Sequence, residues 1–133
     1  MKALLVSQKM LKSIWPMVSD ILQSAVSLFD GYILEDVLDR LKDGRYLLFV
    51  AAEDKTIHAA LVLQVIDYPQ KKTCYVHLVA GKGVNNWIGL MADIEEFANA
   101  MGCEDIEFIG RHGWSKLIPE FDSPARLYRK ALR

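Results

Sequence analysis

The sequence is poor in the residues that build disulfide frameworks and metal centres. It contains two cysteines, Cys74 and Cys103, in 133 residues, and neither has a metal-ligand spacing around it. A disulfide between them is not favoured in a chain with enough apolar residues to form a core. The three histidines, His58, His77 and His112, form no paired motif of the kind that binds zinc. The sequence therefore predicts no metal site.

An excess of charge and long apolar runs are also lacking. The chain has 16 basic and 17 acidic side chains and a formal net charge of -1, which argues against holding nucleic acid or an anionic membrane by bulk charge. No apolar run approaches the ~20 residues that span a bilayer. The N-terminus has no long apolar region followed by a small-residue cleavage site. We therefore expect a soluble, cytoplasmic protein without a membrane partner.

The residues that are present are typical of one folded domain. The chain is 52% hydrophobic and 25% charged, which excludes intrinsic disorder and a collagen-like chain. We expect one domain over residues 1–133, burying about two thirds of the surface that the unfolded chain exposes. From Arg111 onward there are six basic and two acidic side chains, a local net charge of +4. This basic end leaves room for a local anion site, although solvated surface charge is the favoured explanation of most of these residues.

Apolar spacing in the first third of the chain predicts a short strand and two helices. Residues 2–7 contain a short apolar stretch, Ala3 to Val6, and are expected to form an edge strand. Over residues 11–29 apolar side chains recur at steps of three and four, which is typical of one helical stripe. Pro16 falls inside this pattern, so the helix is predicted either to begin near Ser13 or to kink there. A second, shorter helix is predicted over residues 33–42.

The middle of the chain predicts three strands, a helix and a fourth strand. Residues 46–52, 56–66 and 73–80 are rich in branched and aromatic side chains and bounded by turn residues, which predicts an antiparallel meander. A helix with an apolar face follows over residues 88–101. The strand predicted at 105–109 is then most simply parallel to the preceding strand.

A short helix after the fourth strand and a last strand, or strand-like tail, over residues 125–132 complete the prediction. The order β-α-α-β-β-β-α-β-α-β defines an α+β domain with a mixed, mostly antiparallel sheet.

The C-terminal part of the chain contains a distinctive segment. Residues 109–119 read IGRHGWSKLIP, and residues 127–130 read LYRK. This segment and the element order resemble the GNAT superfamily of acetyl-CoA-dependent N-acyltransferases. They are most similar to small bacteriophage-encoded GNAT-like proteins, in which a Gly-Arg-x-Gly-Trp segment starts the short helix. The resemblance implies acetyl-CoA as cofactor, a small-molecule or protein amine as acceptor, and the host cytoplasm or the virion as location.

The turn after the third meander strand is glycine-containing and reads AGKGVNNW from residue 80. Unpaired N–H groups and the dipole at a helix start attract phosphate, and glycine lets a pyrophosphate approach the backbone. An ordinary strand-to-helix turn would use glycine as well. The expected family pattern has Gln or Arg where Leu78 stands, so only its Gly-x-Gly part is present. The cofactor-binding residues predicted here are Val79, Gly81, Lys82, Gly83, Val84 and Asn85.

His77 is the candidate general base, since the attacking amine must be neutral and a base must take its proton. Strict alternation would place His77 with Tyr75 and Val79 on the face that borders the acceptor pocket. The other face would then carry Cys74, Val76 and Leu78. A half-exposed strand histidine without a catalytic role is the competing interpretation.

The other predicted site residues lie in the C-terminal part of the chain. The resemblance implies a tyrosine that protonates the leaving thiolate, but Leu117 and Ile118 occupy its usual place, which leaves Tyr128 as the candidate. Arg111 is predicted to bind an anionic group of the substrate or to cap a strand end. Trp114 is predicted to line the substrate pocket or the core.

Two classes of function remain open at this point. One is a GNAT-type N-acetyltransferase. The other is a catalytically inactive GNAT-like phage protein that acts as a virion, assembly or host-interaction factor, favoured by the incomplete glycine pattern and the missing tyrosine. Partners are expected to be an amine acceptor, a second copy in a homodimer, or a phage structural protein. Binding of nucleic acid is not expected, because no stacking aromatic pattern accompanies the basic end.

Overall fold

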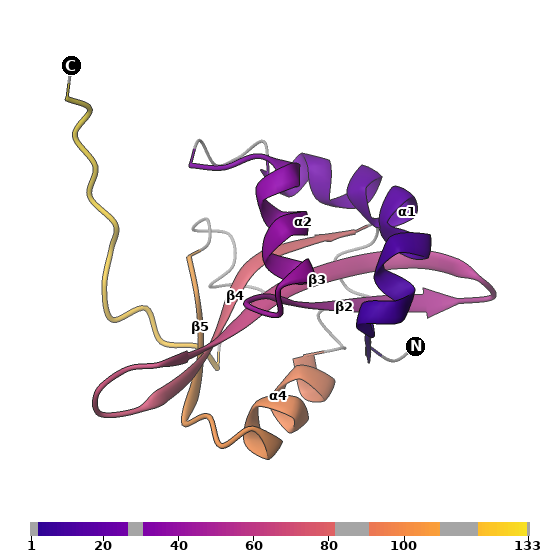
Figure 1. Ribbon diagram of the computed structural model, residues 1–133. Helices are drawn as coiled ribbons and strands as arrows, with labels where there is room; N and C mark the ends of the chain where they lie inside the picture. The colour runs from indigo at the N-terminus through magenta and orange to yellow at the C-terminus, as the bar shows by residue number, and fades with distance from the viewer. Residues whose placement is uncertain (1–2, 27–30, 82–90, 110–119, 133) are drawn as a thin grey trace.

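The structure, a computed structural model, describes residues 3–26, 31–81, 91–109 and 120–132. Helices and strands alternate in the order expected for an α+β domain (Figure 1), which confirms the predicted fold class. The elements are β1 (Ala3–Leu5), α1 (Gln8–Val26), α2 (Leu34–Lys42), β2 (Leu47–Glu53), β3 (Thr56–Asp67), β4 (Lys72–Gly81), α4 (Met91–Ala100) and β5 (Asp105–Phe108).

The strands form one five-stranded sheet in the order β1-β2-β3-β4-β5. The first four are antiparallel neighbours, and β5 pairs parallel with β4. The connection from β4 to β5 includes α4, as a parallel crossover requires. The predicted meander, the N-terminal edge strand and the parallel strand are therefore all present.

The sheet is the middle layer, with α1 and α2 on one face and α4 on the other (Figure 1). Val62 and Leu63 follow one another on β3 and are both fully buried, because successive strand residues point to opposite faces. Val62 belongs to the cluster of buried residues beneath α1 and α2, and Leu63 to the cluster beneath α4. Two apolar cores therefore hold the helices against the sheet.

Helix α1 begins at Gln8, well before the Ser13 start that Pro16 suggested. The Ser7 side-chain oxygen accepts a hydrogen bond from the Met10 backbone N–H at 3.3 Å, which satisfies one of the unpaired groups at the helix start. Pro16 lies inside the helix on its exposed side, where water can bond the carbonyl that proline leaves without a donor. The ribbon of α1 bends along its length (Figure 1), in agreement with the kink alternative.

The strand predicted at residues 125–132 is not formed. Those residues have no regular secondary structure and are exposed, and the tail runs away from the domain (Figure 1). Before it, the Phe121 ring meets the Phe108 ring at 5.6 Å between centroids. A strand needs a neighbouring strand that accepts its backbone hydrogen bonds, and no described strand pairs with the tail.

The turn between β2 and β3 contains a strained residue whose replacement should stabilise the protein. Asp54 and Lys55 both have positive φ, at 53° and 66°, as in the type I′ turns that favour glycine at the second position. We expect Lys55→Gly to raise the free energy of unfolding by about 1 kcal/mol, because a Cβ is unfavourable in left-handed backbone. Chemical denaturation measures this change. Lys12→Gly, the same substitution inside α1, should instead lower it by about 1 kcal/mol.

Candidate active site

The pairing of β4 with β5 stops halfway along β4. The register runs from Thr73 opposite Asp105 to Val76 opposite Phe108, whereas β4 continues to Gly81. Within the described ranges no strand pairs with the β5 side of β4 beyond Val76. This stretch of β4, residues 77–81, is called the open edge below. Strand edges of this kind present backbone N–H and C=O groups to an incoming chain or ligand.

The open edge begins with a β-bulge at His77. Leu63 pairs with Val76 and the preceding Val62 pairs with Leu78, so His77 is an extra residue in β4. An extra residue reverses the alternation of side chains beyond it. Val76 accordingly packs in the core beneath α4, whereas Leu78 packs in the core beneath α1 and α2.

The bulge corrects the predicted faces of β4. Strict alternation placed Val79 with His77 and grouped Leu78 with Val76. In the structure Val79 packs on the α4 side, while His77 contacts Tyr46, which packs on the α1 and α2 side. Of the residues predicted to share a face, Tyr75 alone stays beside His77, with the two ring centroids 4.8 Å apart.

His77 is half-buried and held on two sides. Its ring stacks on Tyr46 with centroids 4.2 Å apart and an interplanar angle of 26°. Its Nε2 lies 2.9 Å from Oε1 of Gln64. An amide oxygen only accepts, so the tautomer that satisfies this bond carries the proton on Nε2 and leaves a lone pair on Nδ1. The ring orientation is therefore fixed by an amide and an aromatic neighbour.

The surroundings keep the His77 ring uncharged. Burial, and then the positive charge of Arg40, lower the pKa of His77 to about 4. Burial is also the main reason why the pKa of Tyr75 and the pKa of Tyr32 are raised, with smaller contributions from neighbouring tyrosines and, for Tyr75, from the Glu107 carboxylate. At neutral pH all these rings are neutral. The face of β4 at the bulge is thus an uncharged aromatic surface, on which His77 is present as a neutral imidazole with a free lone pair.

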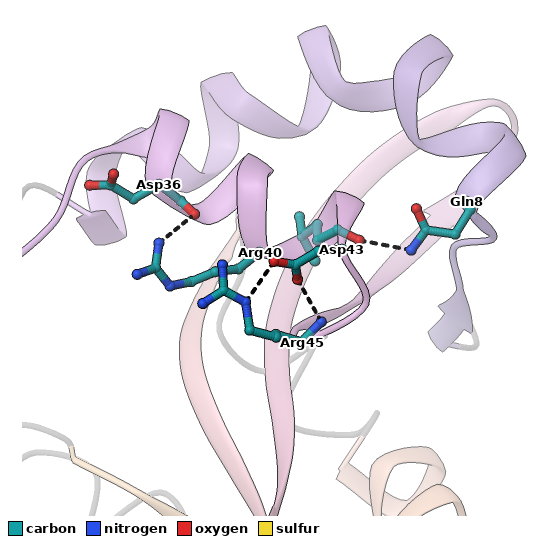
Figure 2. Close-up of polar contacts among 6 residues, drawn as sticks. Gln8, Asp36, Arg40, Asp43 and Arg45 are labelled. Atoms are coloured by element: carbon teal, nitrogen blue, oxygen red, sulfur yellow. Dashed lines mark hydrogen bonds and ion pairs between the residues drawn. The ribbon is translucent and has the colours of Figure 1, made fainter.

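Arg40, which approaches this surface, is positioned by α2 (Figure 2) and by Tyr46, which precedes β2. Its Nη1 donates to the Asp36 carbonyl at 3.0 Å, and its guanidinium carbon lies 6.0 Å from the centre of the Tyr46 ring. Helix α2 is itself tied to α1, because Nε2 of Gln8 donates to the carbonyl of Leu41 at 2.7 Å. These contacts fix the cation and the ring that face His77.

The beginning of β5 is fixed by a polar cluster on the same face. The Asp105 carboxylate accepts hydrogen bonds from Nζ of Lys71 at 2.6 Å and from the hydroxyl of Thr73 at 2.7 Å. Thr73 is fully buried, so this bond satisfies a hydroxyl that water cannot reach. Lys71 also lies 3.7 Å from Glu107. The cluster holds β4 and β5 together at the end of their pairing that is farther from the open edge.

This cluster predicts a pH-dependent stability difference. The hydrogen bond from Lys71, and then that from Thr73, lower the pKa of Asp105 below its ordinary 3.8. A lowered carboxyl pKa contributes stability above the ordinary value that is lost as the pH falls through the lowered one. Asp105→Asn should therefore be less stable than the wild type at pH 7, and the difference should narrow below pH ~4. Urea denaturation at both pH values measures it, with the exposed Glu104→Gln as control. A stability difference between the wild type and Asp105→Asn that stays the same at low pH would contradict the role of the Asp105 charge.

Gly81 ends the open edge, and the structure gives it a packing reason. A Cβ at this position would lie 2.6 Å from the His58 carbonyl oxygen and 2.7 Å from the Ala59 Cβ. His58 is itself the extra residue of a second bulge, in β3, since Ala51 pairs with Ala59 and Ala52 with Ile57. The close approach of β3 therefore requires glycine here whether or not the following turn binds phosphate.

The structure describes only some of the predicted site residues. His77, Val79 and Gly81 lie on the open edge. Tyr128 lies in the C-terminal tail with 86% of its surface exposed, and is not brought to His77. The others lie outside the described residues: Lys82, Gly83, Val84, Asn85, Arg111 and Trp114.

Sequence reasoning missed most of the neighbours of His77. Gln64 on β3, Tyr46 before β2 and Arg40 on α2 are brought to it by strand pairing and helix packing. Their only signal was compositional, since a polar residue inside an apolar strand, such as Gln64, often has a buried partner.

Several solved structures with the same fold are named as acetyltransferases. An aminoglycoside acetyltransferase from an uncultured soil metagenomic sample, in complex with sisomicin, matches with a TM-score of 0.72 and 14% identity, covering 98% of this chain and 95% of that one. A GNAT family acetyltransferase from Staphylococcus aureus matches with a TM-score of 0.70 and 14% identity, over 98% and 97%. A ribosomal-protein-alanine N-acetyltransferase from Brucella melitensis matches with a TM-score of 0.69 and 11% identity, covering 98% of each chain.

These likenesses establish a GNAT-type fold. No protein-family model and no curated protein sequence matches the chain. The comparisons give no support to a bacteriophage origin, which stays a prediction. Among the described helices none is both long and apolar enough to cross a membrane, and the described residues contain no cluster of metal-binding side chains.

Proposed function

We propose that this protein is an N-acetyltransferase that binds acetyl-CoA beside β4 and transfers the acetyl group to an amine. The observation that carries the proposal is the open edge, where β4 continues past the end of its pairing with β5 and the bulge sets His77 at the junction. A GNAT-type fold with solved acetyltransferases as structural neighbours supports it.

The open edge fits the chemistry of acetyl-CoA. The pantetheine arm of coenzyme A contains amide groups, which can exchange hydrogen bonds with unpaired backbone groups of a strand. Residues 77–81 present such groups on the side that β5 leaves uncovered. In this proposal Val79 and Gly81 hold the arm, and Lys82, Gly83, Val84 and Asn85 hold the pyrophosphate. When bound, the cofactor supplies an acetyl thioester for attack by the amine.

His77 would accept the proton that the amine gives up. Because its ring is neutral at physiological pH, a nitrogen lone pair is available without prior deprotonation. A base with a pKa of about 4 is too weak to deprotonate a free alkylammonium, so the acceptor must arrive as the neutral amine. The rate should therefore rise with pH according to the acceptor's own pKa, without a step near 6.5, the ordinary histidine value.

The remaining roles fall to residues of the C-terminal part of the chain. Arg111 and Trp114 would contact the acceptor, which is a small molecule or a protein amine. Tyr128 would act as the general acid only if the tail moved to the site, since it is 86% exposed. A catalytically inactive, phage-encoded form of the fold is the alternative that failure of the proposal would favour.

Calorimetric titration with acetyl-CoA tests the proposal. We expect one saturable site per chain, and release of free coenzyme A when an amine is added. Aminoglycosides and N-terminal alanine peptides are suitable first acceptors, because two of the structural neighbours are named for such substrates. No heat at millimolar acetyl-CoA would remove the proposal. Binding without turnover of any amine would leave cofactor binding and contradict the transfer step.

A further inference from the structure

The C-terminal tail exposes large apolar side chains that a folded protein usually covers. Leu127 is 62% exposed, Tyr128 86% and Leu132 87%. The tail leaves the domain after Phe121, whose ring lies against that of Phe108, and extends outward (Figure 1). Single exposed apolar residues are common, but three within six residues of one segment indicate a surface that binds something.

The tail begins with the residues that favour the start of a helix. Ser123 is a preferred residue just before the first turn, and Pro124 is a preferred residue at the first helical position. The next eight residues, apart from Tyr128, are alanine, leucine, arginine and lysine, which have high helix propensities. A helix this short is not stable alone in water. The tail, which has no regular secondary structure, is therefore expected to form a helix only when its apolar side is covered.

Helical spacing would separate the apolar and the basic side chains of the tail. At 3.6 residues per turn, the apolar ones lie within an arc of about 140° and the basic ones within an arc of about 100° on the opposite side. The apolar set is Leu127, Tyr128, Ala131 and Leu132, and the basic set is Arg126, Arg129 and Lys130. In a strand, each face would carry both kinds of side chain. The pattern therefore favours an amphipathic helix.

The positive charge of the tail is set apart from the acidic remainder of the chain. The net charge is -1 for the whole chain and +4 from Arg111 onward, so the preceding residues carry -5. After Asp122 no acidic residue follows. Even as a helix, residues 124–132 would span about 14 Å, which exceeds the Debye length of about 8 Å at physiological ionic strength. The tail can therefore meet an anionic surface that the bulk charge of the chain does not favour.

We propose that residues 124–132 bind an anionic lipid surface as an amphipathic helix. Leu127 and Leu132 would enter the boundary between headgroups and acyl chains, and Tyr128 would lie at headgroup level, where its ring and hydroxyl suit the interface. Basic side chains border the apolar arc on both sides, so their charged ends can reach lipid phosphates. One short helix of this kind gives reversible attachment.

Two other occupants fit the tail less well. Nucleic acid would bind the basic side alone and leave the apolar side in water. The tail's own domain is disfavoured because the tail extends away from it (Figure 1).

Cosedimentation of the full chain with lipid vesicles tests the proposal. We expect binding to vesicles with about 30% phosphatidylserine, a rise in helical circular dichroism on binding, and weaker binding at high salt. Pure phosphatidylcholine vesicles should bind far less, and a chain that ends at Ser123 should not bind either kind. No binding at millimolar anionic lipid would overturn the proposal. Equal binding by the shortened chain, or binding to duplex DNA without binding to vesicles, would overturn it as well.

A permuted tail separates the helical pattern from composition. The variant Arg126→Leu, Leu127→Arg, Arg129→Leu, Leu132→Arg keeps the charge and the residue types, but mixes them around the helix. It should bind anionic vesicles about tenfold more weakly or worse.

Removing charge alone tests the phosphate contacts. Arg126→Gln with Lys130→Gln should weaken binding by about 25-fold, roughly fivefold for each cation. Wild-type affinity in the permuted variant would contradict the helix, and wild-type affinity in the charge variant would contradict the phosphate contacts. None of these outcomes depends on acetyl-CoA binding or turnover.

Discussion

Replacing His77 with glutamine is expected to lower kcat/KM for acetyl transfer by a factor of about 10² to 10⁴, the usual contribution of a positioned general base. Glutamine is close in size to histidine and can still form a hydrogen bond with Gln64, which now lies 2.9 Å from the imidazole Nε2. It has no basic nitrogen at neutral pH. The loss should therefore appear mainly in kcat, with the affinity for acetyl-CoA retained.

His58 offers a matched control for this experiment. It is also the extra residue of a β-bulge, but in β3 rather than beside the open edge. His58→Gln should leave kcat within about twofold of the wild type, because no proton transfer is assigned to it. Full activity in His77→Gln would contradict the assigned base. An equal loss in both variants would show that the bulges matter only for the fold.

Replacing Gly81 with alanine is expected to lower the free energy of unfolding by about 1–3 kcal/mol, the usual cost of forcing a methyl group into a packed site. The added Cβ would meet backbone and Cβ atoms of β3 at 2.6–2.8 Å, and none of these belongs to the mobile end of a long side chain. Relief requires β3 and β4 to separate at the end of the open edge. Thermal and urea denaturation measure the loss.

Gly31 provides the control for the glycine experiment. A Cβ there meets nothing within 4 Å and the backbone has no positive φ. Gly31→Ala should be neutral or stabilise by about 0.4–1 kcal/mol, because alanine restricts the unfolded chain. Equal effects of the two substitutions would contradict the close approach of β3 to Gly81.

Periodicity predicted the fold well because burial imposes it. The stripe of α1, with Leu11, Val18 and Leu22 buried, has the helical spacing that one apolar core requires. The meander was recognisable because β2, β3 and β4 are apolar runs separated by turn residues. These features are local, so a single sequence displays them.

The bulge at His77 could not be predicted from the sequence. Its evidence is the register between β3 and β4, in which Val76 and Leu78 oppose adjacent residues, and register is a property of two segments. Strict alternation therefore assigned Leu78 and Val79 to the wrong faces. This error affected the predicted site most, because the bulge determines which side chains lie beside His77.

The tail shows a different limit of sequence patterns. Residues 125–132 have a composition that is compatible with a strand, yet no strand forms. A strand also requires a pairing partner, and the sequence pattern does not show whether one is available. The aromatic surface around His77 was missed for a similar reason. Tyr46 and Gln64 are distant from it in the chain and meet it only through packing and pairing.

Backbone amide chemical shifts, recorded during titration with acetyl-CoA, test the central claim most directly. The claim is that the cofactor lies along the open edge of β4, where β5 no longer pairs. Among the residues that the structure describes, we predict the largest changes in amide chemical shift at Leu78 to Gly81 and at Phe108. The shifts of β1 and of the turn at Asp54 should stay unchanged. Absent shifts at saturating acetyl-CoA, or shifts confined to β1 and β2, would contradict it.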